Sequence, residues 1–540
     1  MTALDDYDYI VVGGGSAGCV LAARLTESGR NRVLLLEAGP DDRRFWIQVP
    51  VGYGKSFYDR RVNWMYMTEP VTELDGRRSY WPRGKVLGGS SSINAMVYIR
   101  GQAEDYEDWR NAGNPGWGWD DILPLYRRME SHAWGASAWH GGDGPLHVRA
   151  PSEELHPVCQ DFLDACGELG LPRNPDFNGA SQEGAGTYHI TVRDGLRMSA
   201  ARAYLWPARR RRNLRIVTNA EVTRILFEGR RAIGVEYRRG GRLRTARAAA
   251  EVILSAGSVN SPKLLLLSGV GSADDLKALG IDPVVDLPAV GRNLQDHLDV
   301  GMIYRATVPT LNDQLHPWWG KLWAGFKYLA ARRGPLALSL NQAGGFIRSR
   351  PGLARPNLQV YFCPLSYLKA PPGTRPLMNP DPYPAFNLSI SPCRPTSRGH
   401  LRLRSAEPGD PPEIHPGYLA TDHDIRDVVE GLRFLRRLTD TPTMRRLIAA
   451  EVEPCPTGDD DDSLLAFARA HGVTVYHPVG TCRMGPDAVD CVVDPALRVH
   501  GIEGLRVADA SIFPTLTSGN TNAPSIVIGE KASALILGAS

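Results

Sequence analysis

The first residues that suggest a chemistry are three glycines near the N-terminus, Gly13, Gly15 and Gly18. They follow the apolar run of residues 7–12, which is typical of a buried parallel strand, and lead into a helical stretch at residues 19–26. In this spacing Gly13 permits a tight turn, Gly15 lets a pyrophosphate approach the backbone, and Gly18 lets helix and strand pack closely. The free N–H groups at the start of the helix would bind the phosphates.

An acidic residue completes this pattern. Glu37 ends a second apolar run, residues 32–36, and lies 19 residues after Gly18. A carboxylate at this place accepts a hydrogen bond from a ribose hydroxyl and disfavours a 2′-phosphate. The pattern therefore predicts an adenine dinucleotide site, but it does not distinguish NAD from FAD.

Two further segments are rich in small residues. Residues 81–101 combine a basic turn, glycines, serines and an apolar run, which would suit either a flat ligand held by backbone groups or an ordinary Gly/Ser loop. Residues 252–255 indicate a strand that leads into the segment 257–271. There we expect a helix with Ser261 as its N-cap, Pro262 at its first position and Gly269 at its end.

Together these segments resemble the glucose–methanol–choline (GMC) family of FAD-dependent oxidoreductases. Residues 84–107 and 257–271 match the family's two signature patterns at every constrained position. The resemblance continues at residues 291–297, 476–481, 507–511 and 520–524 and spans the chain, with residues 311–390 matched least. It is strongest to the bacterial choline, aliphatic-alcohol and sorbose dehydrogenases, and it implies FAD as the cofactor.

The resemblance implies an FAD site formed by the glycine turn, the segment 81–101 and several later residues. Val222 matches the position whose backbone holds adenine in the family. Some members attach FAD covalently through a histidine, but the corresponding residue here is Ile93, so we expect non-covalent FAD. The expected set is Gly13, Gly15, Ser16, Ala17, Gly18, Glu37, Ala38, Trp64, Arg83, Val86, Gly88, Ser91, Asn94, Ala95, Met96, Val97, Val222, Ser261, Asp509, Ala510, Asn522 and Ala523.

Two catalytic residues are implied by the same resemblance. His477 matches the family's catalytic histidine, and a side chain of near-neutral pKa is a suitable base for an alcohol hydroxyl. Asn522 is matched to the family's second catalytic position, where it would hydrogen-bond the substrate oxygen as the alkoxide forms. The alternative is that Asn522 is a plain N-cap without substrate contact. A helix from Ala523 onward would direct its positive end at the flavin, where negative charge develops.

The implied reaction oxidises an alcohol CH–OH group to a carbonyl, with the hydroxyl proton going to His477 and a hydride to flavin N5. The resemblance favours a dehydrogenase with a quinone or dye acceptor, acting on primary aliphatic alcohols or polyols. Choline ranks lower because no aromatic or carboxylate cage for its cation can be assigned from the sequence. The alternatives are an O2-dependent aryl-alcohol or choline oxidase, a non-redox lyase or photodecarboxylase on the same fold, and a flavoprotein without catalysis.

An α/β fold, α+β overall, must position these residues. The resemblance implies a Rossmann-like FAD-binding domain at residues 1–155, 200–310 and 475–540. It is interleaved with a substrate-binding domain at residues 156–199 and 311–474, built on an antiparallel sheet flanked by helices. Strand-like runs at 213–217 and 223–227, with a hairpin turn at 228–230, agree with this outline.

Composition and charge limit the partners. The chain has 540 residues, with 62 Lys+Arg against 59 Asp+Glu and a net charge of +3, which argues against a disordered chain or a nucleic-acid binder. The eight scattered cysteines predict buried free thiols and no metal cluster. Together with these thiols, the acidic start and the lack of a long apolar window predict a cytoplasmic protein. The sequence does not distinguish a monomer from a homodimer. A weak peripheral association with the inner membrane is left open.

For several other residues we favour a structural role over a functional one. We expect His140 and His297 to hydrogen-bond the backbone. The basic run Arg209–Arg212 is interpreted as a solvated face rather than a membrane contact, and the acidic run at 459–462 as a helix start rather than a calcium loop. The helically spaced aromatic group Trp318, Trp319, Trp323, Phe326 and Tyr328 is expected to lie in the core rather than at the pocket entrance.

Overall fold

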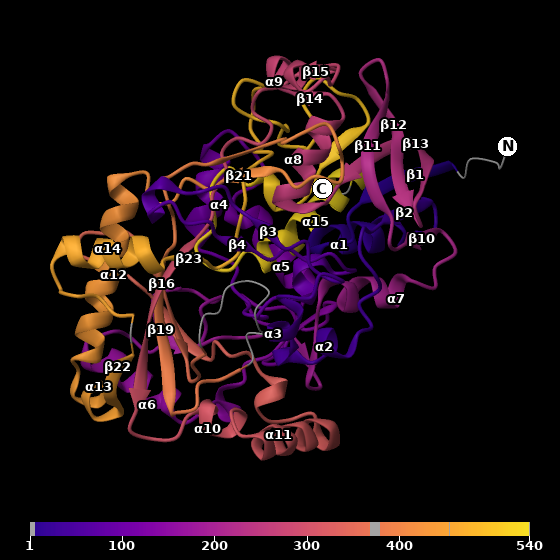
Figure 1. Cartoon of the computed structure of the whole chain (residues 1–540). Coiled ribbons are helices and arrows are strands. Elements are labelled where there is room, and N and C mark those ends of the chain that lie inside the picture. The colour runs from indigo at the N-terminus through magenta and orange to yellow at the C-terminus, as the bar shows by residue number, and fades with distance from the viewer. Residues whose placement is uncertain (1–5, 368–378, 453, 539–540) are drawn as a thin grey trace.

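Two seven-stranded sheets organise the chain in a computed structural model that describes residues 6–367, 379–452 and 454–538. The first sheet, at the upper right of Figure 1, has a parallel part and an antiparallel meander. Its order is β10 (Leu214–Val217), β2 (Val33–Leu36), β1 (Asp6–Val12), β13 (Arg242–Leu254), β12 (Arg231–Arg239) and β11 (Glu221–Glu228), with β24 (Leu505–Val507) beside β13.

The register of the parallel strands positions the glycine turn. Val12 of β1 pairs with Leu36 of β2, so both strands end at the same edge of the sheet. Gly13 then donates its N–H to the carbonyl of Leu36 over 2.8 Å. The residue after each strand, Gly13 or Glu37, therefore lies at the carboxyl edge, where ligands bind in folds of this kind.

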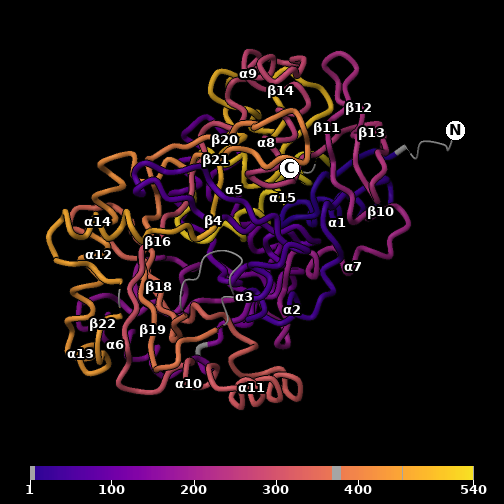
Figure 2. The backbone as a smooth tube through the Cα atoms, viewed as in Figure 1, coloured from indigo at the N-terminus to yellow at the C-terminus, as the bar shows by residue number. Residues whose placement is uncertain are grey.

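Two helices from opposite ends of the chain pack together beside this sheet. Figure 2 shows the indigo N-terminal segment and the yellow C-terminal segment side by side, with α1 (Ser16–Leu25) against α15 (Asn522–Leu537). Gly529 of α15 permits this approach, because a Cβ there would lie 2.7 Å from the carbonyl oxygen of Ala17. The two helix N-termini thus reach the same region of the molecule.

The second sheet is antiparallel and carries helices along its outer side (Figure 1). Its order is β22 (Ile448–Val452), β16 (Leu298–Ala306), β19 (Ala385–Pro392), β18 (Leu358–Cys363), β17 (Ala343–Ile347) and β7 (Gly184–Thr187), with β23 (Val473–Thr474) also beside β16. The associated helices are α6 (Val158–Glu168), α12 (Asp422–Thr439), α13 (Pro442–Leu447) and α14 (Asp461–His471).

The remaining elements form connections around the two sheets. The helices are α2 (Phe45–Gln48), α3 (Tyr53–Ser56), α4 (Ala103–Asn111), α5 (Trp119–Met129), α7 (Trp206–Ala208), α8 (Gly257–Leu267), α9 (Ala273–Ala278), α10 (Leu311–Leu315) and α11 (Trp318–Ala331). The short strands are β3 (Tyr66–Met67), β4 (Tyr80–Trp81), β5 (Glu130–His132), β6 (Leu146–Val148), β8 (Val192–Arg193), β9 (Leu196–Arg197), β14 (Val270–Gly271), β15 (Val285–Asp286), β20 (His400–Arg402) and β21 (Glu413–His415).

The mixed α/β fold class is confirmed, and so are the hairpin after residue 228 and the helix start in the acidic run, where Asp460 caps α14. One strand departs from the expected division of the chain. Strand β16 lies within residues 200–310, which the sequence assigns to the FAD-binding domain, yet it pairs in the second sheet. All eight cysteines are free and seven are buried. Among the described residues, no helix is both long and apolar enough to cross a bilayer.

Two sequence predictions of local structure are wrong. Helix α8 begins at Gly257, so Ser261 lies inside it and is not its N-cap. The capping carboxylate is supplied from far along the chain by Asp509, which accepts the N–H of Gly257 over 2.8 Å. The aromatic group at 318–328 is also not a core element, because within it only Tyr328 is buried.

Candidate active site

A cavity of about 550 Å³ is lined by residues from both sheets. The first sheet contributes the segments that follow its parallel strands, including Gly13 after β1 and Glu37 after β2. The second sheet contributes strand residues, among them Asp299 of β16, Tyr361 of β18 and Ser389 of β19. The cavity therefore joins the predicted dinucleotide site to the part of the chain expected to bind substrate.

The glycine turn leaves no room for side chains. Gly13 has φ +98°, and a Cβ there would lie 2.5 Å from the carbonyl oxygen of Ser255. A Cβ on Gly18 would lie 1.9 Å from the carbonyl oxygen of Gly13. These contacts explain why a glycine is needed at each position. Gly89 adds a further close approach, since its Cβ would meet the Cα of Gly15 at 2.8 Å.

The N-terminus of α1 is equipped for an anion. Gly15, Ser16 and Ala17 line the cavity, no side chain caps the helix, and its first turn carries no acidic residue. Helix N-terminal N–H groups without protein partners, together with the positive end of the helix dipole, bind phosphate groups. This cradle fits the pyrophosphate of a dinucleotide such as FAD.

Glu37 lines the cavity beside this cradle. Its Oε2 accepts the N–H of Gly14 over 2.9 Å and its Oε1 accepts the N–H of Gly39 over 2.7 Å, which fixes the carboxylate in place. Burial raises the pKa of Glu37 to about 7, although the two hydrogen bonds act in the opposite direction and lower it. Each carboxylate oxygen keeps acceptor capacity for a ribose hydroxyl.

His477 lies in the wall of the cavity and is held from two sides. Its backbone N–H donates to Asp296 Oδ1 over 2.8 Å, and the preceding Tyr476 adopts a left-handed conformation with φ +70°. Its Nδ1 lies 2.9 Å from Nδ1 of His297, whose Nε2 lies 2.9 Å from the carbonyl oxygen of Cys393. Residues 296 and 297 follow each other in sequence, so one short segment orients both ends of His477.

This chain of contacts determines where the protons are. The carbonyl of Cys393 can only accept, so Nε2 of His297 carries a hydrogen, and in the neutral ring Nδ1 of His297 is an acceptor. Nδ1 of His477 must then donate to it, which leaves Nε2 of His477 as the acceptor of the ring. Burial lowers the pKa of His297 to about 4. Burial, followed by His297 and Arg83, lowers the pKa of His477 well below its usual value, so both rings are neutral at pH 7.

Asn520 is the residue that faces the lone pair. Its Nδ2 lies 3.2 Å from Nε2 of His477, and its Oδ1 accepts a hydrogen bond from Gln359 Nε2 over 3.3 Å. Gln359 Oε1 accepts from the Tyr361 hydroxyl over 2.7 Å, so Gln359 Nε2 is the end that donates to Asn520. Asn520 therefore directs its oxygen to Gln359 and its nitrogen to His477. His477 and Asn520 both line the cavity, so an oxygen placed there could contact a proton acceptor and an N–H donor together.

The sequence assigned this second position to Asn522, and the structure does not bring Asn522 to His477. Asn522 is the first residue of α15, and its Oδ1 accepts from the Ser16 hydroxyl over 2.9 Å. It lines the cavity where the N-termini of α1 and α15 meet. The motif contains asparagines at 520 and 522. The helix start is the signal that distinguishes them, because Asn520 precedes α15 and Asn522 is its first residue.

Most of the predicted FAD-binding residues line the cavity. These are Gly13, Gly15, Ser16, Ala17, Glu37, Ala38, Trp64, Arg83, Asn94, Ala95, Met96, Val97, Val222, Asp509, Ala510 and Asn522. Six others do not line it: Gly18, Val86, Gly88, Ser91, Ser261 and Ala523. One of these, Ser261, supports a residue that does, because its hydroxyl donates to Asp509. The Gly88 N–H donates to the carbonyl of Gly14, which lies between the lining residues Gly13 and Gly15.

No sequence pattern predicts the end of the cavity near the second sheet. It is lined by Tyr53, Phe57, Leu340, Tyr361 and Cys363, which come from segments without a recognised motif. Ile93, which the sequence places where an attachment histidine would be expected, also lines the cavity. Burial raises the pKa of Cys363 to about 12, so this thiol stays protonated and unreactive.

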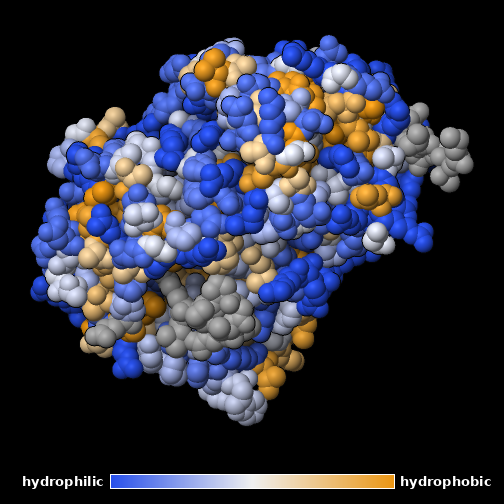
Figure 3. Space-filling model, turned by 45° about the horizontal axis from the view of Figure 1, so that its top comes forward, coloured by the Kyte–Doolittle hydropathy of each residue, from blue (hydrophilic) through white to orange (hydrophobic). Residues whose placement is uncertain are grey.

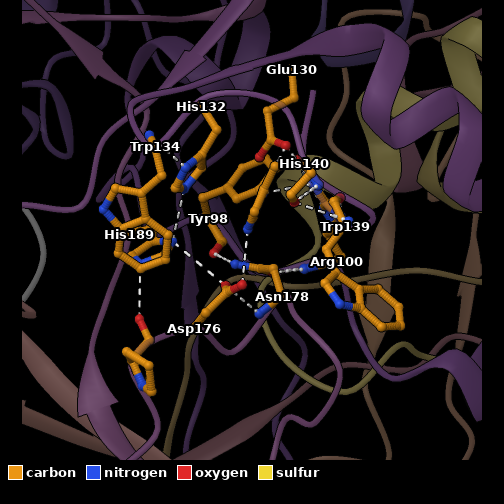
Figure 4. A network of polar contacts seen from close by, with 12 residues as sticks. Tyr98, Arg100, Glu130, His132, Trp134, Trp139, His140, Asp176, Asn178 and His189 are labelled. Atoms are coloured by element: carbon orange, nitrogen blue, oxygen red, sulfur yellow. Dashed lines mark hydrogen bonds and ion pairs between the residues drawn. The ribbon is translucent and has the colours of Figure 1, made fainter. Parts of the chain in front are cut away.

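A second buried polar cluster lies away from the cavity, around β5 and the loop that follows (Figure 4). Glu130, His132 and His140 bring ligand-type atoms within 4.8 Å of one another. However, His140 lies between two carboxylates, with Nδ1 2.9 Å from Glu130 and Nε2 2.9 Å from Asp176. Arg100 forms a 2.6 Å ion pair with the same Glu130 oxygen. The expectation that His140 bonds the backbone is therefore wrong.

Apart from the buried Glu130 Oε1, which has no hydrogen-bond partner among the described residues, the polar groups of this cluster pair with one another. His140 donates from both nitrogens, and despite its burial these two hydrogen bonds raise its pKa to about 9. His189 donates to the carbonyl of Pro175 and accepts from His132 Nε2. Because His132 carries its hydrogen on Nε2, its Nδ1 accepts the Trp134 N–H. We interpret the cluster as a structural ion-pair network.

Comparisons with known proteins agree with this site. The sequence patterns of GMC oxidoreductases match residues 7–299 for the N-terminal part and residues 395–529 for the C-terminal part. The chain is 46% identical to human mitochondrial choline dehydrogenase, covering 99% of this chain and 90% of that protein. It is 44% identical to an alcohol dehydrogenase [acceptor] of Pseudomonas putida, covering 98% and 96%.

A solved structure agrees over the full length. It is a formate oxidase variant from Aspergillus oryzae RIB40, studied for the effect of a mutation on FAD modification. It superposes with a TM-score of 0.91 at 27% identity, covering 99% of this chain and 98% of the other.

Proposed function

This chain belongs to the GMC oxidoreductase family, and from that premise we propose that it oxidises the CH–OH group of an alcohol to a carbonyl with FAD as cofactor and His477 as base. The observation that carries the assignment of the base is the proton arrangement at His477. Its Nδ1 is committed to His297, so the Nε2 lone pair is held toward the cavity beside Asn520.

The residues that would hold FAD lie along the first-sheet side of the cavity. When bound, FAD supplies the acceptor for the substrate's hydride. The N-terminus of α1 would bind the pyrophosphate and Glu37 a ribose hydroxyl. The N-terminus of α15 has neither a side-chain cap nor an acidic residue in its first turn, so its positive end is available to negative charge in the cavity.

The chain's own groups account for the proton transfer. Nε2 of His477 accepts the proton of the substrate hydroxyl, and Asn520 Nδ2 donates a hydrogen bond to the oxygen as it becomes alkoxide-like. His297 accepts from Nδ1 of His477 throughout, which keeps the ring in one orientation. The buried Asp296 holds the backbone of His477 from the other side.

We propose a dehydrogenase for primary aliphatic alcohols or polyols, with a quinone or dye as acceptor. The apolar and aromatic end of the cavity, with Tyr53, Phe57 and Leu340, supports an alkyl chain. A second candidate substrate is choline, because Asp299 and the rings of Tyr361 and Phe57 line the same cavity. A carboxylate and aromatic faces are the groups that bind a quaternary ammonium.

Anaerobic mixing of the FAD-loaded protein with an alcohol panel tests the proposal. The panel contains straight-chain primary alcohols, glycerol, benzyl alcohol and choline, and flavin absorbance reports hydride transfer. Bleaching by alkanols or polyols supports the main proposal, and bleaching by choline alone supports the second. Failure across the panel contradicts both and favours a non-redox role. Reoxidation by a quinone faster than by O2 supports a dehydrogenase over an oxidase.

We expect FAD to be held without a covalent bond. Ile93 offers no nucleophile, and the Cys363 thiol in the cavity stays protonated because burial raises its pKa to about 12. Denaturation with acid followed by centrifugation should leave all flavin in the supernatant. A yellow, fluorescent protein pellet would contradict this prediction.

The two asparagines of the motif should differ in kinetics. Asn520→Ala removes the donor beside His477 and is expected to lower the rate of flavin reduction by about 10²–10³-fold, the range found for loss of one hydrogen bond to a developing oxyanion. Asn522→Ala, the matched control, breaks the hydrogen bond with Ser16 and should act mainly on FAD affinity. Stopped-flow reduction and flavin titration separate the two effects. A larger loss of reduction rate in Asn522→Ala would return the role to Asn522.

Three broader assignments stay proposals. We propose the two-domain division of the chain with β16 assigned to the substrate-binding part, since it pairs in the second sheet. The cytoplasmic location and the choice between monomer and homodimer also stay predictions from the sequence.

A further inference from the structure

Six large apolar side chains of α11 are exposed. They recur at helical spacing along its outer face, and each residue is 55–73% exposed: Trp318, Trp319, Leu322, Trp323, Phe326 and Leu329. The opposite face, with Gly320, Ala324 and Tyr328, is buried against the protein. Scattered exposed apolar residues are normal, but a contiguous face of this kind marks an interaction surface.

The helix lies at the periphery of the molecule. Figure 1 shows α11 along its lower edge, and in Figure 3 orange and pale side chains gather at that edge, below the grey segment. Trp323 and Phe326 stack on each other with ring centroids 5.6 Å apart, and Lys327 lies 5.3 Å from the Trp323 ring. These contacts are within the helix itself, and no described part of the chain buries its outer face.

The segment that carries this face has charges of one sign. Lys321, Lys327, Arg332 and Arg333 are all exposed, and the sequence from residue 314 to residue 350 contains no Asp or Glu. This segment therefore carries more positive charge than the +3 of the whole chain. A surface that complements it must be apolar at its centre and anionic around it.

An anionic lipid bilayer has this composition. Helices that lie in the membrane interface place Trp, Phe and Leu at the boundary between headgroups and acyl chains, with Lys and Arg beside the phosphates. A second copy of the chain fits less well, because two α11 faces would bring like charges together. We propose that α11 docks this protein on an anionic membrane surface, with its aromatic and leucine face inserted at the interface and Lys321 and Lys327 on lipid phosphates.

The inner side of α11 connects this surface to the cavity. Ala324 and Tyr328 belong to the same apolar cluster as Tyr53, Phe57 and Leu340, and the last three line the cavity. Docking through α11 therefore holds the apolar end of the cavity close to the bilayer, where alkanols and lipid-soluble acceptors concentrate. The docking itself goes beyond the proposed reaction and does not depend on it.

The basic run Arg209–Arg212 is the natural comparison. Two of its members are engaged within the protein, since Arg209 pairs with Asp41 and Arg211 hydrogen-bonds the Ala23 carbonyl. Arg210 and Arg212 are exposed but lie beside no comparable apolar helix face. Replacing these two with glutamate changes the net charge as much as replacing Lys321 and Lys327 does, so the pair provides a matched control.

Vesicle co-sedimentation of the FAD-loaded full chain tests the proposal. The vesicles contain phosphatidylcholine alone or phosphatidylcholine with phosphatidylglycerol, at low and high salt. We expect binding to the anionic vesicles that weakens with salt. The double variant Lys321→Glu/Lys327→Glu should bind at least about 30-fold less, from two lost charges near the surface. Arg210→Glu/Arg212→Glu should bind like the unchanged protein.

The apolar part of the surface is tested separately. Leu322→Ser/Phe326→Ser should lower binding by about 10–100-fold even at high salt, because it removes buried apolar area. Leu243→Ser, at a side chain exposed to a similar extent on β13, is the control. Flavin absorbance and reduction by an alcohol confirm that each variant is folded, so a loss of vesicle binding is not a loss of structure or of the proposed activity.

Three results would overturn the proposal. One is a lack of vesicle binding by the unchanged protein at low salt. Another is an equal loss in the arginine control, which would indicate nonspecific charge attraction. The third is a dimer in light scattering that the Leu322→Ser/Phe326→Ser variant dissociates, because α11 would then be a contact between two copies of the chain.

Discussion

His477→Ala is expected to slow reduction of the bound flavin by alcohol about 10²–10⁴-fold, the range typical of general base catalysis. The substitution removes the acceptor at Nε2, and no second base takes its place at Asn520, which can only donate from its amide nitrogen there. FAD should stay bound, because the glycine turn and Glu37 are untouched. Stopped-flow absorbance under anaerobic conditions measures the rate, and flavin content per chain measures binding.

The pH profile sharpens this test. The pKa of His477 lies well below its usual value, first because the ring is buried and then because His297 and Arg83 are near. The ring must be neutral to accept a proton, so the rate should stay level at neutral pH and fall only below the ordinary range of histidine. That acid limb should be absent from His477→Ala. His423→Ala, at an exposed histidine of α12, serves as the control, and near-normal reduction by His477→Ala would remove His477 from the mechanism.

His297→Phe is expected to produce the second largest loss, about 10–10³-fold in the same rate, although His297 does not line the cavity. Without an acceptor at His297 Nδ1, the His477 ring no longer has to carry its hydrogen on Nδ1. A ring with the hydrogen on Nε2 cannot act as the base, and a wrong tautomer is costly in other histidine-dependent enzymes. His297 is thus a positioning residue.

His297→Gln distinguishes positioning from a simple structural role. A glutamine offers an oxygen to His477 Nδ1 and a nitrogen to the Cys393 carbonyl, the two partners that His297 serves. We expect this variant to recover much of the rate and to keep the pH profile of the unchanged protein. Equal losses in His297→Phe and His297→Gln, with the same altered profile, would contradict the tautomer argument.

The dinucleotide site was determined largely by local sequence. Gly18 is needed because the Gly13 carbonyl, five residues away, occupies the space of a side chain, and the φ of +98° at Gly13 itself favours glycine. The start of α15 could also be predicted locally, because Pro524 in a first turn followed by apolar residues at helical spacing is a local signal. His477 was identified by its match to a family motif rather than by spacing.

Other features depended on residues far apart in the chain. Ser261 looked like an N-cap because Ser before Pro is a common helix start, but the carboxylate that caps α8 comes from Asp509, 252 residues away from Gly257. The proton arrangement at His477 depends on His297, 180 residues away, and on the Cys393 carbonyl. No sequence pattern connects such positions, because the contact exists only once the two sheets are packed.

The chemistry of single residues and their local geometry could thus be predicted from the sequence, and their partners could not. Asn520 and Asn522 are the same residue type two positions apart, and only the start of α15 between them sends one to His477 and the other to Ser16. The aromatic spacing of α11 likewise predicts a helix with one apolar face. Whether that face meets the core or the solvent is decided by the elements packed around it, because apolar periodicity carries no information about which neighbour covers the helix.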